Sequence, residues 1–212
     1  MNDINEKIDL KPIWIYFIGL FCSVSFFAIV FGILGLNVDY INVYQIICEG
    51  IIMLIFLVMY KKRLKNDFKR LTKKDLLLII ISSIVLISAN ELISRLFEQL
   101  NVSMNNQDTL VDLFNNHMIL SSFLIVLFGP IVEEFVFRYS FGTFIKSDIL
   151  FLIVSSLSFG LIHGVGVVSI LYILIGLGLG FVYLKTNKNI IASTSIHILN
   201  NFISLIMMIL AL

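Results

Sequence analysis

"IWIYFIGLFCSVSFFAIVFGILGL", from Ile13 to Leu36, contains no charged side chain. A helix needs about 20 apolar residues to cross a bilayer core that is about 30 Å thick. The segment is too long for the core of a signal peptide, and no small-x-small cleavage site follows it. It therefore predicts a helix that spans a membrane and stays there.

The composition extends this prediction to the whole chain. Of its 212 residues, 59% are hydrophobic and 14% are charged, whereas about a quarter are charged in a soluble domain. We expect one integral domain, an all-α polytopic membrane helix bundle with about seven transmembrane helices. Residues 1–117 supply the N-terminal helices and loops, and residues 118–212 supply the helical core. The six apolar segments after the first are Val43–Tyr60, Leu76–Leu96, Met118–Ile145, Ile149–His163, Val165–Leu184 and Ile190–Leu212.

Lysine and arginine residues are concentrated in every second connection between these apolar segments. "KKRLKNDFKRLTKK", Lys61 to Lys74, holds eight of the 15, and five more lie in the N-terminal tail and in the turns after the fourth and sixth segments. The intervening loops hold none. By the positive-inside rule, the N-terminus faces the cytoplasm and the C-terminus faces out, in a multi-pass protein of the cell membrane. We interpret Lys61–Lys74 as a topology signal with affinity for anionic lipid.

Two other features bear on the class of protein. The polar stretch "EQLNVSMNNQDTLVDLFNN", residues 98–116, is weakly amphipathic and predicts either an interfacial helix or a long loop. A net charge of +1 without a basic aromatic patch gives no support for a nucleic-acid partner. The composition, rich in Ile, Lys and Asn, favours a bacterial protein.

Ionisable groups inside the spans are candidates for function because they are costly in an apolar medium. Glu134 and Arg138 are four residues apart and can pair on one helical face, whereas Glu133 points roughly 100° away. Glu133 lies about 22 Å along the helix from Met118, in the cytoplasmic half. Further polar or aromatic candidates occur on two later segments: Phe159, His163, His197, Asn200 and Asn201.

Three ionisable groups elsewhere have simpler interpretations. Glu49 stands alone in the second span, where it can cap a helix end or remain neutral. Glu91 and Arg95 have the spacing of a local ion pair near the membrane interface.

The clustered groups are suited to hydrolysis of an amide bond. A buried carboxylate can act as a general base, and a histidine beside it can orient the water or carry the proton. A second histidine and an asparagine amide can donate hydrogen bonds to a developing oxyanion. No serine or cysteine has the flanking base that marks a nucleophile. The alternative is that these groups only hold helices together.

Three motifs in order carry a family resemblance. "EEFVFR" resembles an EExxxR motif, "FGLIH" an FxxxH motif, and "HILNN" an HxxxN motif. Tyr172 and Gly176 fit the aromatic-xxx-Gly signature between the last two. Over about residues 118–205 the chain resembles the CPBP intramembrane proteases, which are type II CAAX prenyl endopeptidases and relatives linked to bacteriocin processing and self-immunity.

The resemblance implies a catalytic CPBP-like core in residues 118–212. Glu133 would activate water together with His163, and His197 with Asn201 would stabilise the oxyanion. Glu134, Arg138 and Phe159 would support the site. The implied substrate is a membrane-associated protein or peptide, and the cavity would face the cytoplasm among membrane lipids.

Other readings stay open at this point. Glu133 and the two histidines could bind zinc, but the fourth segment has no HExxH pair and the third motif ends in asparagine, a poor zinc ligand. We therefore expect no metal and no cofactor. A non-catalytic bacteriocin-immunity or partner-binding membrane protein is the main alternative function. A proton-coupled carrier is a weaker one, because the chain has no internal repeat.

Overall fold

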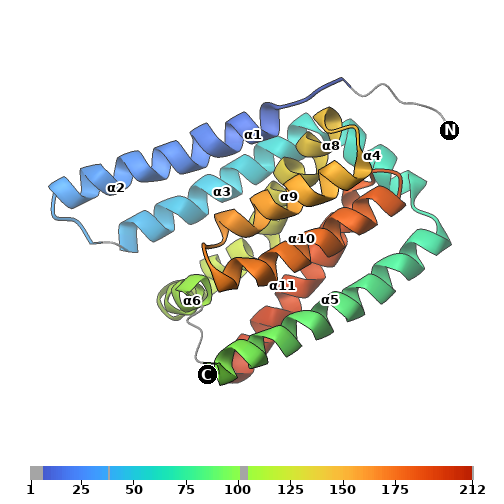
Figure 1. Ribbon diagram of the computed structural model, residues 1–212. Helices are drawn as coiled ribbons and strands as arrows, with labels where there is room; N and C mark the ends of the chain where they lie inside the picture. The colour runs from blue at the N-terminus through green and yellow to red at the C-terminus, as the bar shows by residue number, and fades with distance from the viewer. Residues whose placement is uncertain (1–6, 38, 101–104, 212) are drawn as a thin grey trace.

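The computed structural model describes residues 7–37, 39–100 and 105–211, in which every regular element is a helix (Figure 1). The first long helical segment consists of α1 (Lys11–Tyr16), a π-helical segment η1 (Phe17–Cys22) and α2 (Ser23–Ile33). The predicted all-α bundle is confirmed. The other elements are α3 (Asp39–Met59), α4 (Lys61–Arg70), α5 (Lys73–Gln99), α6 (Asn105–Phe123), η2 (Leu124–Phe128), α7 (Gly129–Glu134), η3 (Phe135–Ser140), α8 (Phe141–Phe144), α9 (Asp148–Ile162), α10 (Val167–Lys185) and α11 (Ile190–Ala211).

Six segments of the described chain are long and apolar enough to cross a membrane. They match six of the seven predicted spans, and the fourth runs without a break from Phe114 to Phe144. The fifth predicted span is the shorter apolar helix α9. Its 15 residues reach about 22 Å, which is less than the bilayer core. Six long apolar helices and this shorter one are thus consistent with the predicted bundle of about seven membrane helices.

The basic segments gather at one end of the bundle. Figure 1 shows α4, the connection from α8 to α9, and the turn from α10 to α11 at this end, while α5 ends beside the C-terminus at the other. We call these the basic end and the non-basic end. The arrangement agrees with the predicted alternation of loops. That the basic end faces the cytoplasm stays a prediction.

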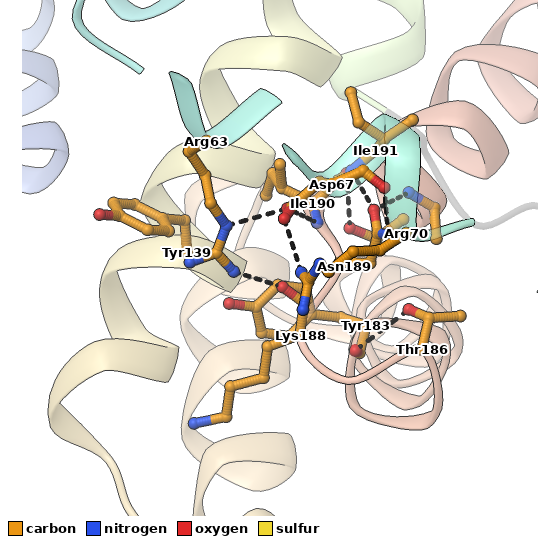
Figure 2. A network of polar contacts seen from close by, with 12 residues as sticks. Arg63, Asp67, Arg70, Tyr139, Tyr183, Thr186, Lys188, Asn189, Ile190 and Ile191 are labelled. Atoms are coloured by element: carbon orange, nitrogen blue, oxygen red, sulfur yellow. Dashed lines mark hydrogen bonds and ion pairs between the residues drawn. The ribbon is translucent and has the colours of Figure 1, made fainter. Parts of the chain in front are cut away.

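The basic segment also has a structural role that its charge pattern did not reveal. Asp67 on α4 is fully buried and accepts hydrogen bonds from Arg63 Nε at 2.9 Å and Arg70 Nη2 at 2.6 Å. Its carboxylate also accepts from the backbone N–H of Ile190 at 2.9 Å, and its carbonyl accepts from Asn189 Nδ2 at 2.8 Å. Figure 2 shows this network, which fastens α4 to the start of α11.

The polar stretch before the fourth span is helical in its described part. α6 begins at Asn105, and the helix is kinked at His117, where φ is −140° and ψ is 52°. Residues 105–116 are therefore a helix and not a loop, and the position of this helix at the membrane interface stays a prediction.

The opening motif of the family resemblance lies in an irregular part of the fourth span. The π-helical segments η2 and η3 flank α7, and Pro130 occupies the first turn of α7. Proline lacks the N–H that would continue the helical hydrogen bonds, so it favours a break at this point. Single π-helical turns are frequent at functional sites.

Glycines allow α9 and α10 to pack closely. A Cβ at Gly160 would lie 2.8 Å from Ser169 O, and one at Gly176 would lie 3.0 Å from Ser156 Cα. Gly164 differs, because nothing lies within 4 Å of its Cβ position and its φ is +152°. It lies in the turn between the two helices.

The Asp67 network predicts a large effect of Asp67→Ala on stability. The change leaves two guanidinium groups and the Ile190 N–H without their acceptor, and breaking such a buried network costs about 2 kcal/mol or more. We expect a clearly lower thermal midpoint in detergent, measured by the fluorescence of Trp14. Lys69→Ala, at an exposed position of the same helix, is the control. Equal midpoints for the two variants would contradict the role of the network.

Candidate functional site

Three stretches of chain bring the predicted site residues together. Glu133 and Glu134 end α7, and Arg138 follows in η3. His163 caps the C-terminus of α9, and His197 lies one-third of the way along α11. α9 ends where the fifth apolar segment was predicted to end, and His163 at this end lies beside Glu133, with Nε2 3.6 Å from Oε1.

Glu134 forms the buried support of the site. Its side chain has no exposed surface, and its Oε1 lies 3.1 Å from His197 Nδ1 and 3.6 Å from Arg138 Nη2. The predicted pairing of Glu134 with Arg138 is present. The contact with His197 was not predicted, because it joins α7 to a helix that begins more than fifty residues later.

Arg138 is held from two further sides. Its Nη1 donates to Ser155 Oγ at 3.1 Å, and Ser155 in turn donates to Phe137 O at 2.7 Å. Its guanidinium lies over the Phe159 ring, 5.0 Å from the centroid, in the geometry of a cation–π contact. Phe159 of the FxxxH motif is therefore a packing partner of both the arginine and, at 5.6 Å between centroids, the His197 ring.

Glu133 faces both histidines. Its Oε1 lies 3.6 Å from His163 Nε2, and its Oε2 lies 3.6 Å from His197 Nε2. These distances exceed those of direct hydrogen bonds, and contacts of this length are commonly bridged by water. The Glu133 side chain keeps 16% of its surface exposed, whereas Glu134 has none, so the two neighbouring carboxylates have different access to water.

Two contacts fix the orientation of the His163 imidazole ring. His163 Nδ1 lies 2.8 Å from Phe159 O, and because a carbonyl only accepts, Nδ1 must carry the proton. His163 also stacks on Tyr172, with ring centroids 4.4 Å apart and planes at 18°. The aromatic residue of the aromatic-xxx-Gly signature thus orients the histidine, and Gly176 permits the close approach of α9.

Asn201 is anchored to the irregular fourth span. Its Nδ2 donates to Ile125 O at 2.9 Å, and its Oδ1 accepts from Asn200 Nδ2 at 3.3 Å. Since an amide group has two N–H hydrogens, one remains for another acceptor. The four predicted catalytic side chains Glu133, His163, His197 and Asn201 all line one cavity of about 500 Å³.

Glu49 also lines this cavity, although the sequence analysis assigned it no catalytic role. It is 9% exposed and is contacted by Gln45 Nε2 at 3.4 Å. A Cβ at Gly129 would lie 3.8 Å from carboxylate oxygens of both Glu49 and Glu133, so the two carboxylates flank that glycine. The sequence feature that could have indicated this role is the occurrence of a single acidic residue, Glu49, within an apolar span.

Glu91 and Arg95 form the predicted local ion pair, with Arg95 Nε 2.6 Å from Glu91 Oε1.

The side chains of the cavity bear on whether the site could bind a metal ion. Within the described ranges, no three His, Cys, Asp or Glu side chains are grouped in a way that could hold a metal ion. Both histidines instead direct Nε2 to the carboxylate of Glu133.

A comparison with protein families matches residues 115–203 to the model described as "Type II CAAX prenyl endopeptidase Rce1-like". No curated protein and no solved structure matches the chain. The matched segment holds all three motifs and the cavity residues that they contribute. Residues 115–203 of this multi-pass membrane protein are therefore similar to the Rce1-like family of type II CAAX prenyl endopeptidases, which agrees with the resemblance that the motifs indicated.

Proposed function

We propose that the protein is an intramembrane endopeptidase that hydrolyses peptide bonds of membrane-associated proteins or peptides with water activated by Glu133. One observation carries the proposal: each oxygen of the Glu133 carboxylate faces the Nε2 atom of a different histidine, on the wall of a cavity. A water held between these groups lies within reach of a general base.

The reaction uses each group in a distinct way. Glu133 takes a proton from the water while the oxygen of that water attacks the carbonyl carbon of the peptide bond. His163 accepts a second hydrogen bond from that water through Nε2, since its Nδ1–H is held by Phe159 O. Glu133 then gives its proton to the leaving amine as the C–N bond breaks.

His197 and Asn201 stabilise the negative charge that develops on the carbonyl oxygen. His197 donates from Nε2, while Nδ1–H is held by Glu134, so the donating form is the imidazolium. Asn201 donates the amide hydrogen that Ile125 O does not use. Donors fixed before the reaction are effective because they need no reorganisation in the transition state.

Glu134 and Arg138 balance the charges of the site. Arg138 and a protonated His197 carry two positive charges, and Glu133 and Glu134 carry two negative charges. A buried charge is tolerated when it is paired and hydrogen-bonded. Glu134 acts through His197, and we assign it and Arg138 positioning roles.

We propose that this chemistry needs no metal ion. Zinc bound by Glu133 and the two histidines is the alternative. Its fourth protein partner on α11 would be Asn201, whose amide is a poor zinc ligand and already donates to a backbone carbonyl.

Glu133→Gln should lower the rate of peptide cleavage by about 10²–10⁴-fold, the usual contribution of a general base, without changing the thermal midpoint. The substrate is found first, by comparing peptides in the medium and membranes of cells that carry wild type or variant. Rates are then measured on the purified proteins with that peptide. Asp148→Asn, an exposed carboxylate-to-amide change in α9, is the matched control.

Unchanged cleavage by Glu133→Gln would refute the assignment of the base. The partner-binding alternative would be favoured if the wild type cleaves no peptide and if the Glu133→Ala variant still protects cells from a bacteriocin or still binds a partner protein.

The cleavage rate should also be insensitive to chelators. Incubation with 1,10-phenanthroline or EDTA should leave it within twofold of the untreated value, and elemental analysis should find no stoichiometric zinc. A loss of activity that added zinc restores would overturn the metal-free mechanism.

A further inference from the structure

Glu49 is a buried acid that the proposed mechanism does not use. It lies on α3 and lines the cavity of about 500 Å³ that holds the four catalytic side chains, with 9% of its surface exposed. α3 lies outside residues 115–203, so the family match assigns Glu49 no role. An ionised carboxylate is costly to bury unless it is paired. The partners of Glu49 therefore bear on what the cavity binds.

Within the described chain, Glu49 has one hydrogen-bond partner. Gln45 Nε2 donates to its Oε1 at 3.4 Å, which is a long hydrogen bond from a neutral amide. Oε2 accepts no hydrogen bond from the described residues, and none of their lysine or arginine side chains forms an ion pair with Glu49. The carboxylate is thus half satisfied and has no counter-charge in this part of the chain.

The cavity wall does not supply the missing charge. Its described lining contains the carboxylates of Glu49, Glu91 and Glu133 and no lysine or arginine. Glu91 is already paired with Arg95 at 2.6 Å, and the two histidines of the cavity face Glu133. When Glu49 is ionised, the cavity therefore carries a negative charge that the described residues do not balance.

Gly129 lies between Glu49 and the catalytic base. Glu49 Oε2 and Glu133 Oε1 both lie 3.8 Å from the position that a Cβ at Gly129 would occupy, so the two oxygens are separated by no more than twice that distance. An extended peptide advances about 3.3–3.6 Å per residue, and the long stem of a lysine or arginine reaches beyond its backbone. A cationic side chain at Glu49 therefore belongs to a residue within about three positions of the bond that Glu133 hydrolyses.

We propose that Glu49 is a specificity residue that binds the ammonium or guanidinium group of a lysine or arginine close to the scissile bond of the substrate peptide. The cationic group donates to Glu49 Oε2, while Gln45 holds Oε1. The proposal rests on the proposed function and adds a substrate class to it. Hydrogen bonds between charged groups are about twice as strong as neutral ones, and a neutral residue at this position of the peptide would leave the buried carboxylate unpaired.

Protonation of Glu49 is the other way to avoid the cost of a buried charge. A neutral Glu49 would give the cavity no preference for a cation over an anion. The two states therefore differ in a property that can be measured without any substrate.

Thiol labelling measures the charge of the cavity independently of catalysis. Cys22 and Cys48 are both free and are replaced by alanine, and a single cysteine is introduced as Ile125→Cys on the cavity wall. The protein, in neutral detergent micelles, reacts with either of two methanethiosulfonates of similar size. One carries a trimethylammonium group and the other a sulfonate group.

Glu49→Gln, which keeps the shape of the side chain, should lower the ratio of the cationic to the anionic labelling rate about tenfold, because one charge near the thiol is removed. Asp148→Asn, at an exposed position outside the cavity, should leave the ratio within twofold. An unchanged ratio in Glu49→Gln would overturn the proposal, and so would a cysteine that neither reagent reaches. The result does not depend on whether the protein hydrolyses a peptide.

Substrate specificity is then tested with the peptide found by comparing cells. Replacing its lysine or arginine near the cleaved bond by norleucine should raise KM about tenfold and leave kcat within twofold, since a contact of the bound peptide is lost. In Glu49→Gln the two peptides should have KM values within twofold of each other, whereas Asp148→Asn should discriminate as the wild type does. A substrate without lysine or arginine within three positions of the cleaved bond would contradict the proposal, as would discrimination that persists in Glu49→Gln.

Discussion

The contact between Glu134 and His197 is the interaction on which the site depends. It joins α7 to α11 through a carboxylate that has no exposed surface and is also paired with Arg138. Because Nδ1 of His197 is engaged by Glu134, its Nε2 is directed to Glu133. Since adjacent residues of a helix point about 100° apart, fixing Glu134 toward Arg138 turns Glu133 to the cavity. Two neighbouring acids thereby acquire different roles, one structural and one exposed to water.

Much of this arrangement followed from the sequence. Long charge-free segments specify spans because the bilayer sets their length, and six of the seven were located to within a few residues. Helical spacing correctly paired Glu134 with Arg138 and Glu91 with Arg95. The ordered motifs also identified the side chains that line the cavity: Glu133, His163, His197 and Asn201. These are local regularities, and the sequence expresses them directly.

Contacts between distant helices were not accessible in the same way. Asp67 belongs to a segment whose composition indicated only a topology signal, yet it binds the start of α11. Glu49 enters the cavity from α3, outside the segment that the family model matches.

The most direct test of this account is the protonation of His197. The chain has three histidines, so ¹⁵N-histidine NMR in micelles yields few signals, which single His→Gln variants assign. We predict that Nδ1 of His197 carries a proton, and that Glu134→Gln changes the ¹⁵N shifts of His197 while leaving those of His117 unchanged. A neutral His197 with an unprotonated Nδ1, or shifts unaffected by Glu134→Gln, would contradict the claim that Glu134 holds the histidine toward Glu133.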